Sequence, residues 1–198
     1  TADDYLVRTL SMPPKFGIIS KAYSQKPKAN EGNNTVDIYV LGYNANKNLT
    51  TASSTLKNNL KTYLNQYRMI GDSVGIKDAF IINIAVNFEI ITVPNFNNNQ
   101  VLTRCINELR TYFNIDNWQI NQPILLRDIE LLLDRVRGVQ TVQSITITNK
   151  TGVSSGYSQY AYDISGATQG KLIYPSIDPC IFEVKYPELD IKGRTVTI

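Results

Sequence analysis

The chain has 198 residues, a mass of 22.3 kDa and a formal net charge of +3, with 42% hydrophobic and 19% charged residues. This composition is neither disordered nor membrane-spanning, and the scattered basic residues give no nucleic-acid footprint. We expect a soluble α+β domain. Because histidine is absent and the two cysteines are isolated, we also expect that it is not an enzyme and holds no cofactor or metal.

The first residues, Thr1-Ala2-Asp3-Asp4, lack the basic start and apolar run of a signal peptide, so we expect a piece of a longer polypeptide. A short strand is predicted over 16–25, because the prolines before it disfavour a helix. The polar run 26–35 predicts a loop. Alternating valine and isoleucine then predict a strand over 36–41, followed by another loop.

Residues 51–68 predict an amphipathic helix, because leucine and tyrosine recur every three or four positions. Ser53 is a candidate N-cap, and Gly71 is expected to let the chain turn after the helix. The run 76–93 predicts one unusually long strand with an apolar face and a second face that is wet or covered by polar neighbours. A strand of this length is expected to bend at a bulge or to project from its domain.

Two further helices are predicted over 98–113 and 123–137, each with one broad apolar stripe. Cys105 lies inside the first stripe, which favours a buried small hydrophobe over a reactive thiol. Pro123 is expected in the first turn of the second helix, and Gly138 just beyond its end.

A strand rich in β-branched residues is predicted over 139–148. The segment 149–179 is rich in glycine, proline and tyrosine, and a structureless stretch of that length is rare inside a domain. We therefore expect either short strands and turns within the domain or an arm that orders on a partner. Cys180–Tyr186 predicts a final strand, and Arg194–Ile198 one more.

Together these elements predict an α+β fold, with two or three helices packed on mixed or antiparallel sheets. We expect residues 1–148 to form the α+β core and residues 149–198 to form a strand- and loop-rich segment that is a candidate oligomerisation arm. The predicted core side chains are those on the apolar faces: Leu60, Leu64, Ile82, Ile84, Ile106, Leu109, Leu132 and Ile145.

Catalytic motifs are weak. The run 71–75 has the letters of a nucleophile elbow, but a predicted helix precedes it, a strand follows and no histidine is available, so we interpret it as a turn. The carboxylates Glu89, Glu108 and Glu130 are far apart in sequence, and nothing selects a glycosidase pair among them. A mixed-charge helix face is interpreted as solvated, with weak ion pairs along the helix; its residues are Arg127, Glu130, Asp134 and Arg137.

Four features occur in an order found in a known family. The first is Thr1–Tyr5 followed by a short strand at 17–22, and the second is the strand 36–41 followed by a helix that ends at Tyr67–Asp72. The third is the alternating run 82–88, and the fourth is a last helix that ends in Arg137-Gly138-Val139. In this order the chain resembles the baseplate J-like family of tailed phages. Within that family it is most similar to the C-terminal part of the gene 6 baseplate wedge proteins of T4-like phages. The resemblance covers about residues 1–148, and residues 149–198 match the T4-like proteins better than general J-like ones.

The resemblance implies a structural subunit of the baseplate wedge, a late virion protein of the phage tail that assembles in the host cytoplasm. It implies a homo-oligomer with dimer and ring contacts that closes an inner ring around the tail hub, and partners among other wedge and hub proteins. Amphipathic tyrosines suit such contacts, so we expect an interface at Tyr157, Tyr160, Tyr162, Ile173 and Tyr174. Two alternatives stay open: a carbohydrate- or receptor-binding tail module that uses tyrosines, and a cell-wall glycosidase that uses Glu or Asp.

Overall fold

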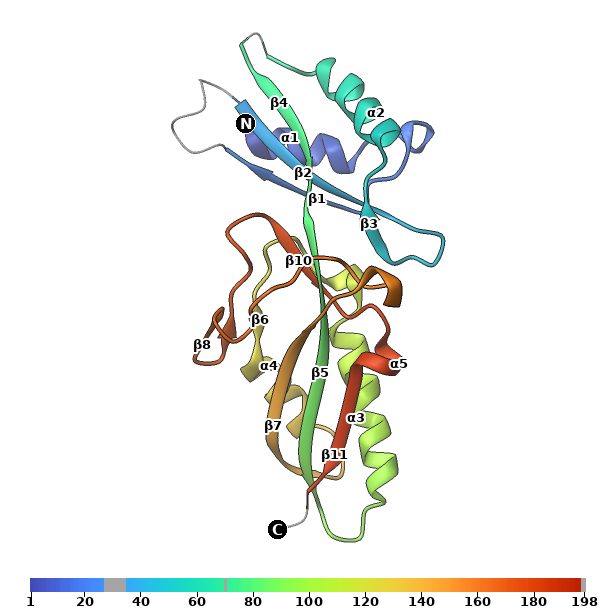
Figure 1. Cartoon of the computed structure of the whole chain (residues 1–198), viewed down its shortest axis with the longest axis vertical. Helices are drawn as coiled ribbons and strands as arrows, with labels where there is room; N and C mark the ends of the chain where they lie inside the picture. The colour runs from blue at the N-terminus through green and yellow to red at the C-terminus, as the bar shows by residue number, and fades with distance from the viewer. Residues whose placement is uncertain (27–34, 70, 197–198) are drawn as a thin grey trace. The chain divides into compact units, whose positions relative to one another are not determined.

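The computed structural model describes residues 1–26, 35–69 and 71–196, and the chain divides into two compact units, Thr1–Phe80 and Ile81–Ile198. Each unit has helices packed on a β-sheet, which confirms the predicted α+β class (Figure 1). In this division residues 149–198 belong to the second unit. Their role as an oligomerisation arm stays a prediction.

The first unit is built on a four-stranded sheet with β2 at its centre. Strand β1 pairs antiparallel with one edge of β2, while parallel β4 and the short antiparallel β3 pair with the other edge. The strands are β1 (Lys21–Gln25), β2 (Thr35–Tyr43), β3 (Leu49–Thr51) and β4 (Ser73–Asp78).

Two helices, α1 (Ala2–Leu10) and α2 (Ser54–Asn65), cover one face of this sheet. The predicted N-cap of α2 is confirmed, because the Ser53 side chain accepts a hydrogen bond from the Leu56 amide. Alternate residues of β2 point into the resulting core. Its buried side chains are Tyr5, Met12, Val36, Ile38, Val40, Ala52, Leu60 and Leu64.

The first 25 residues differ from the prediction. Residues 2–10 form α1, for which no element was predicted; its apolar face is short, and a capping box of Thr1 and Asp4 fixes its start. The predicted strand 16–25 is wrong in its first half, where the 3₁₀ helix η1 (Pro14–Phe16) precedes a loop and β1. The predicted loop over 26–35 falls mostly outside the described residues.

The predicted single strand over 76–93 is in fact two strands, separated at Ala79. The first, β4, belongs to the sheet of the first unit, whereas β5 (Phe80–Thr92) is the central strand of the second unit. Even-numbered positions are apolar from Val74 to Ile90 except at Asp78, so the pattern gives little sign that the strand partners change. The expected bulging is confirmed, because the register between β5 and β7 shifts twice near the end of β5.

In the second unit, β5 pairs antiparallel with β7 (Val139–Lys150) and parallel with β11 (Ile191–Thr195). Strand β10 (Cys180–Glu183) also pairs with β5. The even-numbered side chains of β5 from Ile82 to Ile90 are buried, whereas Asn87 on the opposite face is exposed. The helices therefore cover the even face, with α3 against β11 and α4 against β7 (Figure 1).

The remaining elements of this unit are short, apart from its two main helices. A three-stranded sheet in the order β6-β9-β8 lies beside α4, and the Lys171 ammonium next to β9 pairs with Glu130 of that helix. The bounds are α3 (Asn98–Tyr112), η2 (Ile115–Asn117), β6 (Ile124–Leu125), α4 (Leu126–Asp134), η3 (Val153–Ser155), β8 (Thr168–Gln169), β9 (Leu172–Ile173) and α5 (Pro187–Asp190).

The predicted helix 98–113 is confirmed, but the helix predicted over 123–137 begins only at Leu126. Pro123 is not in its first turn, because residues 124–125 pair with β9 instead. Gly138 has φ +102°, and a Cβ there would approach Val101 within 2.6 Å, so it marks a tight packing point rather than the position just after the helix.

Five of the eight predicted core residues are buried, and Ile106, Leu132 and Ile145 are only half-buried. Cys105 is buried as predicted, and burial raises the pKa of its thiol to about 11, which keeps it protonated and unreactive at neutral pH. Of the two predicted C-terminal strands, Cys180–Tyr186 is confirmed as the shorter β10. The other lies at Ile191–Thr195 rather than 194–198, and residues 197–198 fall outside the described chain.

Candidate functional site

Two buried or half-buried asparagines hold the tyrosine-bearing segment against β5. The side chain of Asn83 donates to Oε2 of Glu183 at 2.9 Å and accepts from the Ser158 amide at 2.7 Å. The side chain of Asn149 donates to the Asn83 carbonyl at 2.9 Å and accepts from the Tyr162 amide at 3.0 Å. These amides satisfy backbone groups that a loop would otherwise leave unpaired, so the segment packs on its own unit.

The predicted interface tyrosines make contacts within the chain. The Tyr157 hydroxyl donates to Oδ1 of Asp190 at 2.7 Å, and burial together with this carboxylate raises the pKa of Tyr157 to about 12. The Tyr162 hydroxyl donates to the carbonyl of Tyr174 at 2.6 Å, and burial is the main cause that raises the pKa of Tyr162. These bonds fix the two rings inside the second unit.

The five predicted interface residues therefore differ in exposure. Ile173 is buried, and Tyr157, Tyr160 and Tyr162 are half-buried, whereas Tyr174 is 44% exposed. The structure brings Tyr162 and Tyr174 together and places Tyr157 with Asp190. Contact of any of the five with another chain stays a prediction.

The loop that follows Tyr174, residues 174–179 and here called the Ile177 loop, is the first of two surface features. Ile177 is 87% exposed, the highest value among the large hydrophobic side chains described. A proline lies on each side of the Ser176-Ile177-Asp178 tip, the Ser176 hydroxyl donates to the Asp178 carbonyl at 2.5 Å, and the Ser176 amide donates to Sγ of buried Cys180 at 3.3 Å. The loop is thus held in one shape with an apolar and an acidic side chain exposed.

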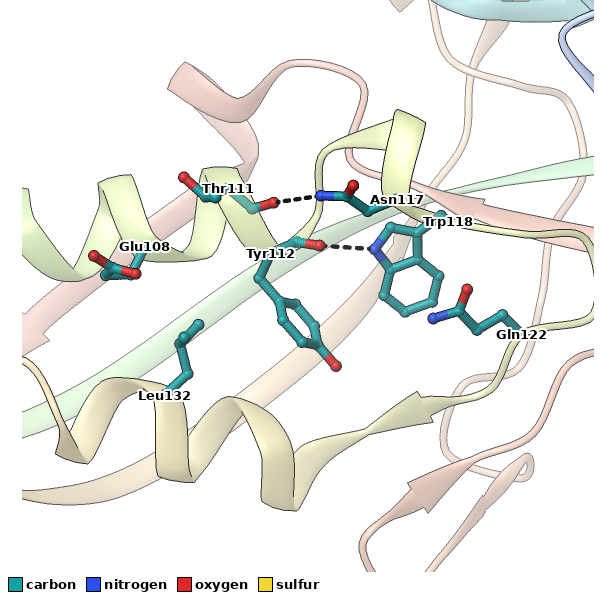
Figure 2. Close-up of a pocket in the computed structure, with 7 residues that line it drawn as sticks. All are labelled: Glu108, Thr111, Tyr112, Asn117, Trp118, Gln122 and Leu132. Carbon is teal, nitrogen blue, oxygen red and sulfur yellow. Dashed lines mark hydrogen bonds between the residues drawn. The ribbon is translucent and has the colours of Figure 1, made fainter.

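The second feature is a groove between α3 and α4, here called the α3–α4 groove. It consists of two adjoining pockets of about 320 Å³ each, and both are lined by Glu108 and Leu132. Glu108 comes from α3 and Leu132 from α4, so the two helices contribute opposite walls (Figure 2). Leu132, expected in the core, is instead a half-buried wall of this groove.

The first pocket is bounded by aromatic side chains at the end of α3. The Trp118 indole donates to the Tyr112 carbonyl at 3.0 Å, and the Asn117 side chain donates to the Thr111 carbonyl at 3.3 Å (Figure 2). Trp118 also stacks on Phe113 with ring centroids 5.5 Å apart. This end of the groove is therefore fixed by hydrogen bonds and ring packing.

The second pocket is apolar at its base and basic at its rim. Leu132 and Val136 supply apolar surface, and the arginines lining it are Arg104, Arg135 and Arg137. The Arg104 guanidinium donates to the Arg137 carbonyl at 3.2 Å. In the part of the chain that the structure describes, none of these three guanidinium groups forms an ion pair. With Glu108 the only carboxylate lining the pocket, the rim carries excess positive charge suited to an acidic group.

The three glutamates considered for a glycosidase pair lie in different places. Glu89 pairs with Arg194 and Glu130 pairs with Lys171, so these two carboxylates do not join Glu108 in the groove. Within residues 1–26, 35–69 and 71–196, no group of three His, Cys, Asp or Glu residues is placed to hold a metal ion. Of the helices in those ranges, none has the length and apolar character that a membrane crossing requires.

The structure also shows the 71–75 run and the mixed-charge helix face. The 71–75 run, interpreted as a turn, is a turn only at Gly71, with φ +96°, because Ser73–Gly75 already belong to β4. The predicted ion pairs along the mixed-charge helix face are wrong for the described residues: Glu130 pairs with Lys171, and Asp134 accepts from the Val142 amide at 3.1 Å. Arg137 from the same face lines the groove.

Sequence reasoning did not find the groove or the Ile177 loop. Arg104 comes from α3, whereas Arg135 and Arg137 follow the end of α4 about 30 residues later, and only the packing of the two helices brings the three arginines together. The available signal for the loop was a single isoleucine between prolines, followed by aspartate.

Comparison with known proteins concerns the fold. No protein-family model matches the chain, and no curated protein matches its sequence. Fifteen chains of solved structures do match. One belongs to the cryo-EM structure of the anti-feeding prophage (AFP) baseplate, 6-fold symmetrised; its TM-score is 0.55 at 10% identity, and the match covers 75% of this chain and 33% of that one. This chain thus spans about a third of the chain it matches, and at such low identity the likeness shows a shared fold.

Proposed function

We propose that this chain is a structural component of a phage-type tail baseplate. The observation that carries the proposal is the fold likeness to a chain of a prophage baseplate over 75% of this chain. The order of elements in the sequence, which resembles the baseplate J-like family, points independently to the same class of assembly. The chain would therefore be located in the virion tail, in contact with other baseplate proteins.

In its finer form the proposal is a wedge subunit, similar to the gene 6 proteins of T4-like phages, that self-associates in an inner ring. A ring needs two different contact patches on each copy, because a single two-fold patch is used up in a dimer. The Ile177 loop and the α3–α4 groove are two different patches of one unit. The six-fold averaging of the matched baseplate is compatible with a subunit that repeats around an axis.

The geometry favours this structural role over the two alternatives. A glycosidase needs two carboxyl groups about 5–10 Å apart in one cleft, and Glu108 is the only carboxylate that lines the groove. A carbohydrate-binding module needs accessible aromatic rings gathered in a concave site. In the groove Trp118 is only 2% exposed, and Tyr174, which is 44% exposed, does not line the groove.

The test is to locate the chain in particles from its source. Antibodies against the purified chain should label the tail end of intact particles, and quantitative mass spectrometry should find a fixed copy number per particle. Absence of the chain from purified particles would overturn the proposal. So would hydrolysis of peptidoglycan by the wild-type chain that Glu108→Gln abolishes.

A further inference from the structure

We propose that the Ile177 loop of one copy inserts into the α3–α4 groove of a second copy. Ile177 would lie against Leu132 and Val136, and Asp178 among the arginines of the rim. The inference rests on the proposed function, because it names the surfaces through which one baseplate subunit would contact the next.

The loop has the properties of an inserting element. Ile177 is 87% exposed in the single chain, so it does not occupy the groove of its own copy, and removing it from water is favourable. The Ser176 bonds and the two flanking prolines already hold the tip in one shape. A preorganised loop loses less conformational entropy on binding than a mobile one.

The groove offers a complementary receptor. Each pocket has a volume of about 320 Å³, near the lower end of the range for ligand sites, which suits one or two side chains better than a large molecule. Leu132 and Val136 match an aliphatic side chain. Three arginines without an ion-pair partner in the described chain match the carboxylate of Asp178, so charge and polarity both select an aliphatic–acidic tip.

The contact would be heterologous, because the inserting loop and the receiving groove are different surfaces. Each copy then uses its loop on one neighbour and its groove on the other, and repetition of this contact gives an open chain or a closed ring. Two copies related by a two-fold axis would instead present the same patch to each other.

A charge-reversal experiment on the full chain tests the proposal. One variant is Asp178→Arg, and the second combines Arg135→Glu with Arg137→Glu. All three side chains are exposed, so we expect both variants to fold. Each variant alone should self-associate at least about tenfold more weakly than the wild type, as judged by mass against concentration in sedimentation or light scattering.

The equimolar mixture provides the decisive reading. The basic loop of the Asp178→Arg variant meets the acidic groove of the double variant. The native acidic loop of the double variant meets the native basic groove of the Asp178→Arg variant. Both contacts then join opposite charges, so the mixture should assemble like the wild type. Ile177→Ser should weaken association, whereas Val153→Ser, at another strongly exposed apolar position of the same unit, should leave it unchanged.

Three results would overturn the contact: a monomeric wild type at all accessible concentrations, variants that associate like the wild type, or a mixture that does not recover. If the wild type is monomeric but the variant that combines Arg135→Glu with Arg137→Glu fails to enter particles, another baseplate protein occupies the groove. The self-contact is then wrong. If the variants enter particles normally, the contact is wrong while the proposed function stands. Absence of the wild-type chain from particles contradicts the proposed function itself.

Discussion

Asn83 is a polar residue of β5 that is buried, with only 1% of its surface exposed. The sequence predicts that the odd face of β5 is wet or covered by polar neighbours, and both descriptions apply along its length. At Asn83 the face is covered by the segment after β7, and at Asn87 it is open to solvent. The identity of the covering segment could not be predicted, because it depends on hydrogen bonds to residues about 75 positions away.

We expect Asn83→Ala to lower the free energy of unfolding of the second unit by about 2–3 kcal/mol. The substitution removes a donor to the buried Glu183 carboxylate and the acceptor of the Ser158 amide. Urea unfolding measures the effect, and Asn87→Ala, an exposed position on the same face, should stay within about 0.5 kcal/mol of the wild type. Equal small losses in the two variants would show that the amide does not hold the segment.

A second residue-scale prediction concerns Tyr157 and alkaline pH. Its pKa is raised from 10.0 to about 12, chiefly by burial and then by the hydrogen bond to Asp190. Because the pKa in the folded state is above that in the unfolded state, the stabilisation is complete below about pH 10 and is lost as pH rises toward 12. The stability difference between wild type and Tyr157→Phe should therefore be constant up to about pH 9 and shrink above pH 10.

Unfolding in urea across this pH range measures the stability difference. A tyrosinate absorbance titration gives an independent reading, because Asp190→Asn should move the late-titrating tyrosine to lower pH. A stability difference that stays constant through pH 12 would contradict the assigned pKa.

At the scale of elements, local sequence predicted α2, α3, β2 and β7 well, because each helix buries one apolar stripe and the two strands are rich in β-branched residues. It failed where distant pairing decides the structure. The first residues of the predicted 123–137 helix are drawn into a strand with β9, and the predicted 76–93 strand is shared between two sheets. Helix α1 was missed because it buries only Tyr5 and Thr9, too few for an apolar stripe.

Distant packing also explains why Leu132, a predicted core residue, lies in the groove. Leu132 belongs to the apolar stripe of α4, but it is on the side that faces α3, where the two helices leave space between them. Helical phase predicts that a residue turns toward its neighbours, and it does not predict whether the neighbours close over it. The candidate groove is therefore visible only in the packed structure.

The apolar stripe of α3 gives an element-scale prediction. Leu109 is fully buried between this helix and its sheet, so Leu109→Ala should lower the free energy of unfolding by about 2–5 kcal/mol. Leu131→Ala on α4, where the side chain is 43% exposed, should cost less than about 1 kcal/mol. Equilibrium urea unfolding compares the two, and a loss below about 0.5 kcal/mol for Leu109→Ala would mean that its face is not core.

At the scale of the whole molecule, the sequence led to the α+β class and to an expected division near residue 148. The two compact units of the structure meet inside the predicted 76–93 strand, at Phe80/Ile81. No glycine-rich linker and no change of composition mark that point, because the single run 76–93 contributes to a strand of each unit. After residue 149 the composition changes, and the elements there are short strands and turns of the second unit.

Two compact units with separate cores should respond separately to core substitutions. Trp118 is the only tryptophan in the chain and is buried in the second unit, so its fluorescence reports unfolding of that unit. We expect Leu64→Ala, in the core of the first unit, to lower the midpoint of an early far-UV circular dichroism transition and to leave the Trp118 transition in place. Leu109→Ala should lower the Trp118 midpoint instead. If both substitutions shift both signals together by the same amount, the chain unfolds as one cooperative structure, and the two cores are not energetically independent.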